Sequence, residues 1–387
     1  MSVVFINHPL ETWTPTSSGA LATIIWQCCR VAEKEAQHDA ELPWVITRSS
    51  EAARFPWAQT IVLDPPALPA SPFAIKALRA ERKLTGWRHL SHRAYAFQVM
   101  SALKRQGLQN RPLVLINDPE MTVYLRRHFP KATILHWFQN QLEASPRFRS
   151  LYPEAADVTA GVSDFTSRWI ADYYKIGSVP TIYNGVDLEQ FTPSTVPAKG
   201  LPAISFVGRT GIEKAPDLLL KAALMLSERT KDFRVLMIGS NHWDRLEMDD
   251  YQQELVRLAN TLEERGIFVE RPGHVSRPAL PGVLRSAQIH VVPSRWDEPF
   301  GLTTVEGMAS GLAIAASRTG GTSEIIGDSG FLFERDNAGQ LADCLEQLVC
   351  DGALRFDYAK QARNRAEDFP WEATWRQLNG LLGQAKI

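Results

Sequence analysis

The sequence predicts an α/β protein built from two doubly wound, Rossmann-like domains. The chain has 387 residues, more than twice the ~150 that one domain usually holds, so two separate cores are expected. Short runs rich in β-branched residues alternate with helical stretches in both halves, which is the pattern of parallel sheets wound with helices. These two observations predict the fold class, and the positions of the runs predict where one domain ends and the next begins.

The predicted strands form two groups. The first half holds runs at residues 3–6, 44–47, 60–63, 112–117, 132–138 and 157–163, and the second half at 203–208, 233–239, 289–293, 312–317 and 331–333. Between the groups, an Asn-Gly pair and several prolines are typical of a linker. We therefore predict an N-terminal domain, a linker, a C-terminal domain and a terminal helical tail, at residues 1–183, 184–202, 203–370 and 371–387.

The composition is that of a soluble globular protein. Hydrophobic residues make up 44% and charged residues 22%, and no run of about 18 apolar residues could span a bilayer. The first residues lack the charged and apolar regions of a signal peptide, so we expect a cytoplasmic protein. The four cysteines have no metal-site spacing and are expected to be reduced thiols.

The most informative segment is residues 294–316, where Glu298 and Glu306 stand on either side of Gly301. Gly301 is expected to open a helix, whose first backbone N–H groups, from Gly301 to Thr304, would be unpaired and would favour a diphosphate. Glu306, one turn into the helix, could accept two ribose hydroxyls, and Glu298 could face the sugar. The alternative is that Glu298 is a solvated loop charge and that Glu306 only satisfies the helix dipole.

Two cations follow the first strand of the second half. Arg209 and Lys214 lie in the turn after residues 203–208. Arginine offers a forked donor and lysine a point charge, a combination suited to a diphosphate that leaves with extra negative charge. Taken alone, the pair is equally explained as two surface charges.

Together these segments resemble the retaining glycosyltransferases of family four, which carry two glutamates with seven residues between them and an Arg and a Lys after an upstream strand. Further segments follow in the family's order: Tyr183 to Asp187, Gly239, Arg271 to Val275, and the residues Gly320, Gly321 and Glu324. The family usually has a glycine where this chain has Asn241. The resemblance covers about residues 180–335 and implies the GT-B fold, in which two Rossmann-like domains face each other across a cleft and the C-terminal tail packs back on the N-terminal domain.

The resemblance also implies roles for individual residues. The catalytic group would comprise Glu298, Arg209, Lys214 and His136. The nucleotide-sugar donor would be bound by Glu306, Phe300, Gly301, Leu302, Thr303, Gly239, Val275 and Gly321. His136 follows the apolar run of a strand, where a histidine is also explained as a core residue.

The acceptor side is less marked in the sequence. The family often has a Gly-Gly turn after the first strand, whereas this chain has Ser18 followed by the single Gly19. One glycine can still bring backbone amides close to a phosphate at a helix start. We therefore expect Ser18 and Gly19 to contact the acceptor or a phosphate.

No metal or other cofactor is expected. The chain has no Asp-x-Asp triplet, so charge neutralisation would fall to Arg209, Lys214 and the helix N-terminus. The resemblance implies transfer with retention, by front-face attack in an ion-pair-like transition state in which the leaving diphosphate takes the acceptor proton. Covalent catalysis by a carboxylate is the alternative mechanism.

Residues 76–105 hold eight Lys or Arg and one acidic residue, interleaved with apolar side chains. Two interpretations stay open: peripheral contact with an anionic membrane at its inner face, or a solvated face above a packed apolar stripe. No recognition motif for nucleic acid accompanies these charges.

The sequence therefore predicts a metal-independent, retaining hexosyltransferase. Its donor would be a UDP- or GDP-linked sugar, and its acceptor a hydroxyl of a glycan, a glycolipid or a small molecule, in the assembly of cell-surface glycans or glycolipids. The alternatives are a sugar-nucleotide epimerase or hydrolase of the same fold, and a non-catalytic protein that binds sugar nucleotides.

Overall fold

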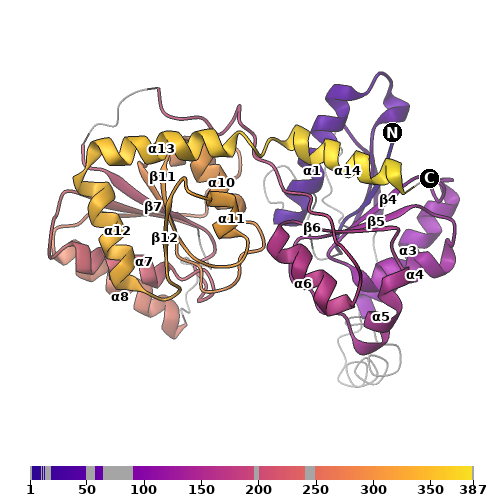
Figure 1. Cartoon of the computed structure of the whole chain (residues 1–387), viewed down its shortest axis with the longest axis horizontal. Coiled ribbons are helices and arrows are strands. Elements are labelled where there is room, and N and C mark those ends of the chain that lie inside the picture. Colours follow the sequence, from indigo (N-terminus) through magenta and orange to yellow (C-terminus); the bar gives the residue numbers. More distant parts are fainter. Residues whose placement is uncertain are drawn as a thin grey trace. The chain divides into compact units, whose positions relative to one another are not determined.

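The computed structural model describes residues 2–9, 11, 13, 19–48, 57–63, 90–195, 200–239 and 249–385 (Figure 1). The chain forms two compact units, one of Met1–Asn184 with Trp371–Ile387 and one of Gly185–Pro370. Each unit contains a six-stranded sheet in which every described pair of strands is parallel. The predicted α/β class with two doubly wound sheets is confirmed.

The first unit has the strand order β3-β2-β1-β4-β5-β6. Its strands are β1 (Val4–Ile6), β2 (Trp44–Arg48), β3 (Gln59–Leu63), β4 (Leu113–Ile116), β5 (Ile134–Phe138) and β6 (Val158–Gly161). Its α-helices are α1 (Ala20–Glu35), α3 (Leu90–Arg105), α4 (Pro119–His128), α5 (Pro146–Leu151), α6 (Asp164–Tyr174) and α14 (Trp371–Gln384), with short 3-10 turns η1 (Asp39–Glu41) and η2 (Tyr152–Glu154).

The alternation of side chains along β1 divides the first unit into two layers of helices. Val4 and Ile6 belong to the core formed with α3, α4 and α5. Phe5 points to the other face, where its ring lies 6.5 Å from that of Trp375 in α14. Helix α14 packs beside α1, and the indole of Trp375 donates a hydrogen bond of 2.9 Å to the Glu35 carboxylate. The last helix of the chain therefore belongs to the first unit.

The second unit has the strand order β12-β11-β10-β7-β8-β9. Its strands are β7 (Ala203–Val207), β8 (Arg234–Ile238), β9 (Val269–Gly273), β10 (Ile289–Val292), β11 (Ala313–Ser317) and β12 (Phe331–Phe333). Its helices are α7 (Pro216–Leu226), α8 (Asp250–Glu264), α9 (Leu280–Leu284), α10 (Leu302–Ala309), α11 (Thr322–Ile326), α12 (Ala338–Cys350) and α13 (Gly352–Ala366).

One strand, β9, was not predicted from the sequence. Its residues, VERPG, include Pro272 and Gly273, which disfavour strands. The strand lies at the edge of the sheet, with a shift of register opposite Leu236 to Ile238. An edge position tolerates a proline because one row of its N–H groups needs no partner strand.

The two faces of the second sheet carry different side chains. Ile204 and Phe206 of β7 enter a large apolar core with α7, α8 and α12. Ser205 points to the opposite face, where its hydroxyl lies 3.1 Å from Nδ1 of the buried His290. A Cβ on Gly307 would lie only 2.7 Å from the His290 ring, so glycine allows α10 to approach this face closely. Figure 1 shows α10 and α13 beside each other in this layer.

The basic segment of residues 76–105 is described only from Leu90 onward. Here Tyr95, Val99 and Leu103 of α3 are buried in the core of the first unit, whereas Phe97 is 60% exposed. The described part of the apolar stripe is thus used mainly for packing. Among the described residues, no helix is long and apolar enough to cross a membrane.

Candidate functional site

The strand order places a topological switch point in the second unit at the carboxyl ends of β7 and β10. These strands are neighbours, yet the chain continues from β7 toward β8 on one side and from β10 toward β11 on the other. Ligands of open parallel sheets bind at such a switch point, because the two following loops leave in opposite directions. The loop after β7 carries Arg209 and Lys214, and the loop after β10 carries Glu298.

Lys214, which is half-buried, and the buried Glu298 form an ion pair between these two loops. The ammonium Nζ lies 2.5 Å from Oε1 of Glu298, which is 4% exposed, and the Ser294 hydroxyl donates to the same oxygen at 2.5 Å. Lys214 Nζ also lies 5.3 Å from the centre of the Trp296 ring. Among the described residues, Oε2 of Glu298 has no hydrogen-bond partner. The pair brings one cation and one carboxylate, 84 positions apart in sequence, to a single point.

Arg209 lies in a different environment from Lys214. Its side chain is 68% exposed and lies 3.5 Å from the carboxylate of Glu213, four residues later. Such an exposed pair contributes little to stability because water screens it. Arg209 is therefore free to reorient toward an anion, whereas Lys214 is already held in place.

The backbone of Glu298 is fixed by the loop after β11. The Gly321 N–H donates to the Glu298 carbonyl at 2.6 Å. Gly320 has a positive φ of 49°, and a Cβ there would lie 2.3 Å from the same carbonyl oxygen. Any other residue at position 320 would push Glu298 away, so glycine is required for this contact.

Helix α10 begins four residues after Glu298. Gly301, at its N-cap, has a φ of +88°, and its carbonyl accepts a hydrogen bond from Thr304 N at 3.0 Å. The expectation that the Thr304 amide would be unpaired is therefore wrong, because the first turn closes on itself. Within the described structure, the amides of Leu302 and Thr303 keep no such partner and remain available to an anion.

Glu306 is buried on the first turns of α10, with 2% of its surface exposed. Its Oε1 accepts a hydrogen bond from Arg277 Nη2 at 2.6 Å. Its Oε2 is also buried but has no partner within the described structure. A buried carboxylate oxygen without a donor is costly, and two ribose hydroxyls are one chemistry that would satisfy it.

Arg277 is a site residue that the sequence did not reveal. It follows Val275 by two residues in the loop after β9, and its partner Glu306 lies 29 positions further along the chain. No local pattern signals such a contact. Its position brings the segment that resembles a base-reading loop, including the half-buried Val275, close to Glu306.

Phe300 and Gly239, two further predicted donor residues, have clear roles in packing. Phe300 is 2% exposed and its ring packs 5.9 Å from that of Phe369, so its side chain is part of the packing of the second unit. Gly239, at the end of β8, has a φ of +119°, and a Cβ there would lie 1.9 Å from the Gly208 carbonyl oxygen. Glycine therefore lets the loops after β7 and β8 touch. Asn241 lies outside the described residues.

The structure corrects the expectation that His136 is catalytic. The imidazole is fully buried in β5, where Nε2 accepts the Asp118 N–H at 3.0 Å and Nδ1 lies 2.7 Å from the Tyr152 hydroxyl. Because Nε2 accepts, the neutral ring donates from Nδ1 to Tyr152. Both nitrogens are used within the first unit, so His136 is a satisfied core histidine.

The buried histidines predict a loss of stability in acid. Burial lowers the pKa of His136 to about 3 and that of His290 to about 4, against 6.5 in an unfolded chain. Below pH 6.5 the two histidines bind protons in the unfolded chain but stay neutral in the native state. The free energy of unfolding therefore falls as the pH drops toward these values, and each histidine contributes about 1.4 kcal/mol per pH unit.

Urea unfolding at pH 7.5 and 5.5 measures this effect. His136→Gln should reduce the difference between the two pH values by about 1.4 kcal/mol relative to wild type. The exposed His128, changed in the same way, serves as the control. An unchanged pH dependence in His136→Gln would mean that the native protein accepts a proton at this ring.

Of the two predicted acceptor residues, the structure describes one. Gly19 is the N-cap of α1, and Ser18 lies outside the described residues. The carboxylate of Glu11 lies next to Gly19 and accepts a long hydrogen bond of 3.5 Å from Ala22 N. Burial raises the pKa of Glu11, and the bond to Ala22 partly offsets this. A carboxylate of the chain itself thus lies near the helix start where an acceptor phosphate was expected.

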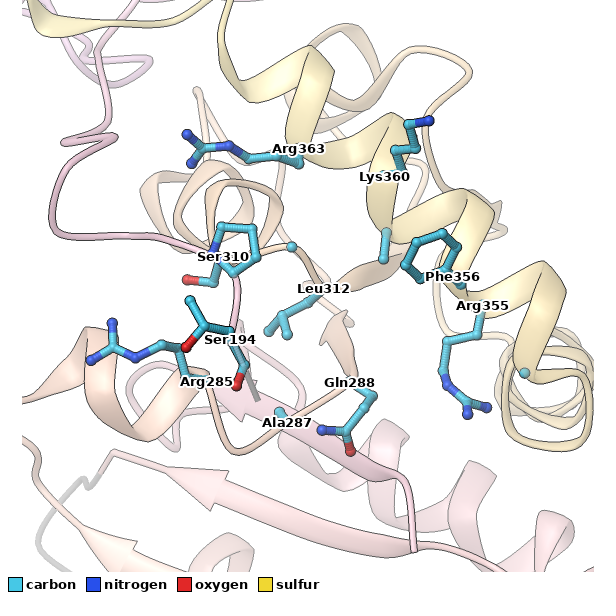
Figure 2. A pocket seen from close by; sticks show the side chains of 15 residues that line it. Ser194, Arg285, Ala287, Gln288, Ser310, Leu312, Arg355, Phe356, Lys360 and Arg363 are labelled. Atoms are coloured by element: carbon cyan, nitrogen blue, oxygen red, sulfur yellow. The ribbon is translucent and has the colours of Figure 1, made fainter. Parts of the chain in front are cut away.

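A separate pocket of about 630 Å³ lies in the second unit (Figure 2). Its residues Ala287 and Leu312 lead into β10 and β11, so it lies at the amino ends of these strands, opposite the edge that carries Glu298. Figure 2 shows the charged ends of Arg355, Lys360 and Arg363 pointing in three different directions. They do not converge on one anion, and the pocket is not part of the candidate site.

Comparisons with known proteins show which sequences and folds this chain resembles. Residues 189–365, within the second unit, match the family model "Glycosyl transferases group 1". A D-inositol 3-phosphate glycosyltransferase of an Arthrobacter species is 33% identical over 231 residues, which cover 57% of this chain and 52% of that protein. The match therefore spans about half the length of this curated relative.

Two solved structures share the fold over nearly the whole chain. Sucrose-phosphate synthase from Thermosynechococcus elongatus has a TM-score of 0.76 and 21% identity, and the match covers 99% of this chain and 98% of that one. An Anabaena HepE protein in complex with UDP and glucose has a TM-score of 0.70 and 16% identity, with coverage of 99% for both chains. Residues 189–365 thus match the glycosyl transferases group 1 family, and the chain as a whole has the GT-B fold of known glycosyltransferases.

Proposed function

We propose that this protein is a retaining, metal-independent glycosyltransferase that uses a UDP- or GDP-linked hexose. The observation that carries the proposal is the convergence of Lys214, Glu298 and the start of α10 at the switch point of the second sheet. The match of residues 189–365 to a glycosyltransferase family supports it. So does the binding of UDP and glucose by a protein of the same fold.

The site residues suggest how a donor would be held. The diphosphate would meet the amides of Leu302 and Thr303, and Glu306 Oε2 would accept from the ribose. Lys214 lies beside the Glu298 carboxylate, so its charge is fixed where the leaving diphosphate would gain negative charge. Arg209 could turn in from the surface to add a forked donor.

In the proposed reaction the bond between the anomeric carbon and the diphosphate oxygen breaks. The acceptor oxygen forms the new bond on the same face of the sugar, and its proton passes to the departing diphosphate. Glu298 positions the sugar through Oε2 and remains unmodified. The acceptor is proposed to be a hydroxyl of a glycan, a glycolipid or a small molecule.

Calorimetry tests the nucleotide part of the proposal. UDP, GDP and ADP are titrated into the full chain in chelator without added metal. We expect selective binding of UDP or GDP; binding of none of the three, with or without Mg²⁺, would contradict the proposal. Turnover is then measured with and without hydroxyl acceptors, with the anomeric configuration of the product read by NMR. Donor consumption that is independent of any acceptor would instead indicate a hydrolase or epimerase.

A further inference from the structure

A second ionic cluster, centred on the buried Asp217, involves the loop after β10 that also carries Glu298. Asp217, in the first turn of α7, is 2% exposed, and its two carboxylate oxygens accept bidentate hydrogen bonds of 2.7 and 2.8 Å from Arg295. Tyr251 of α8 donates to it at 2.5 Å, and Lys221 at 2.8 Å. Burial by itself would raise the pKa of Asp217, but the hydrogen bonds from Arg295, Lys221 and Tyr251 outweigh it and hold that pKa well below its usual range.

Arg295 joins the two loops that carry the proposed catalytic residues. It lies in the loop after β10, three positions before Glu298. Its guanidinium donates to the Ile212 carbonyl at 3.1 Å and its backbone N–H to the Glu213 carbonyl at 2.8 Å, and both carbonyls belong to the loop after β7. The guanidinium thus bonds to Ile212, which precedes Lys214 in the chain, and to Asp217, which follows it.

The loop that Arg295 holds is strained. Ala215, directly after Lys214, has a φ of +50° and is fully buried. A non-glycine residue in this region is unfavourable and persists only where its surroundings impose it. The hydrogen bonds of Arg295 lie on both sides of Ala215: those to Ile212 and Glu213 precede it, and the pair to Asp217 follows it. They are the contacts that hold this segment to the loop of Glu298.

We propose that Arg295 is a positioning residue, anchored by Asp217, that sets the place of the Lys214 ammonium beside Glu298 in the donor site. This inference rests on the proposed function, because Lys214 has a role only if the protein transfers a sugar. The position of the Lys214 amine can nevertheless be tested without measuring turnover.

The kinetic test is a double-mutant cycle. Turnover of a UDP- or GDP-sugar is compared for wild type, Arg295→Ala, Lys214→Ala and the double variant. Arg295→Ala should lower kcat at least about fivefold when Lys214 is present and less than twofold when it is absent, with little change in donor KM. Equal losses in both backgrounds would overturn the proposal.

The structural test uses labelling of lysines by an amine-reactive reagent, read by mass spectrometry. In Arg295→Ala, Lys214 should react several-fold faster relative to the exposed Lys360. Arg229→Ala is the matched control, because Arg229 also bridges two carboxylates, at 2.7 Å each, but on the surface of the same unit. Unchanged labelling of Lys214, or equal acceleration in both variants, would overturn the proposal even if the protein transfers no sugar.

A conservative variant guards against misfolding. Arg295→Lys keeps the charge but loses the two parallel hydrogen bonds to Asp217. It should retain the thermal unfolding midpoint more fully than Arg295→Ala and still accelerate the labelling of Lys214. Wild-type labelling and turnover in Arg295→Lys would show that the bidentate geometry is not needed.

Discussion

Replacing Lys214 by alanine should lower the turnover of a nucleotide-sugar donor by roughly 10²–10³-fold, the usual loss when one preorganised group that stabilises developing charge is removed. The ammonium lies 2.5 Å from a carboxylate that is itself buried, so its position is fixed before any substrate arrives. Its charge matters most as the diphosphate departs, and the effect should therefore fall on kcat. Steady-state kinetics with saturating donor measure it.

The same substitution leaves Glu298 without its cation, and this could lower turnover through misfolding alone. The thermal unfolding midpoint separates the two effects, because a Lys214→Ala variant that keeps its midpoint and loses kcat has lost the cation and not the fold. The double variant Lys214→Ala with Glu298→Gln removes both charges and should recover any midpoint that Lys214→Ala loses. Its turnover stays low in either case, since Glu298 is itself proposed to position the sugar. Lys360→Ala, at the opposite edge of the sheet, is the control. Near-normal kcat in Lys214→Ala would show that Lys214 does not stabilise the leaving group.

Replacing Glu306 by alanine should weaken the binding of UDP or GDP by about 1.5–3 kcal/mol, which corresponds to a Kd about ten- to more than a hundredfold higher. The expectation rests on Oε2, which is buried and has no partner among the described residues. Calorimetry with the nucleotide diphosphate measures this change directly. Comparison with the corresponding deoxyribose nucleotides places the lost interaction on the ribose hydroxyls.

Ser310→Ala provides a matched control for Glu306→Ala. Ser310 follows α10 at its other end and also has a buried oxygen without a partner, but it lines the separate pocket of Figure 2. Its loss should leave nucleotide binding unchanged. An equal loss in both variants would point to a general disturbance of α10, and unchanged affinity in Glu306→Ala would remove its assignment to the ribose.

Much of the architecture was predictable because it depends on local patterns. Buried parallel strands read as short β-branched runs, and eleven of these mark strands of the two sheets. The edge strand β9 was missed because its sequence contains Pro272 and Gly273. A run of hydrophobic residues indicates a buried strand, and a strand at the edge of a sheet can form with fewer of them.

The candidate site was only partly predictable. Glu298, Glu306, Arg209 and Lys214 were chosen for their residue types and spacing, and the structure brings Lys214 and Glu298 into contact. His136 was chosen for its position on a strand, but sequence cannot tell which neighbours reach a ring nitrogen. Here the amide of Asp118 and the hydroxyl of Tyr152 occupy both nitrogens.

The α/β class, the two parallel sheets and the two carboxylates around Gly301 could be predicted because each follows from local patterns of residues. The partners of the charged side chains depend on the fold: Arg277 for Glu306, Arg295 for Asp217, and Lys214 for Glu298, at separations of 29, 78 and 84 residues. Such pairs form because the parallel strand order brings distant loops to one edge of a sheet. Burial there leaves each charge dependent on the partner that the fold supplies.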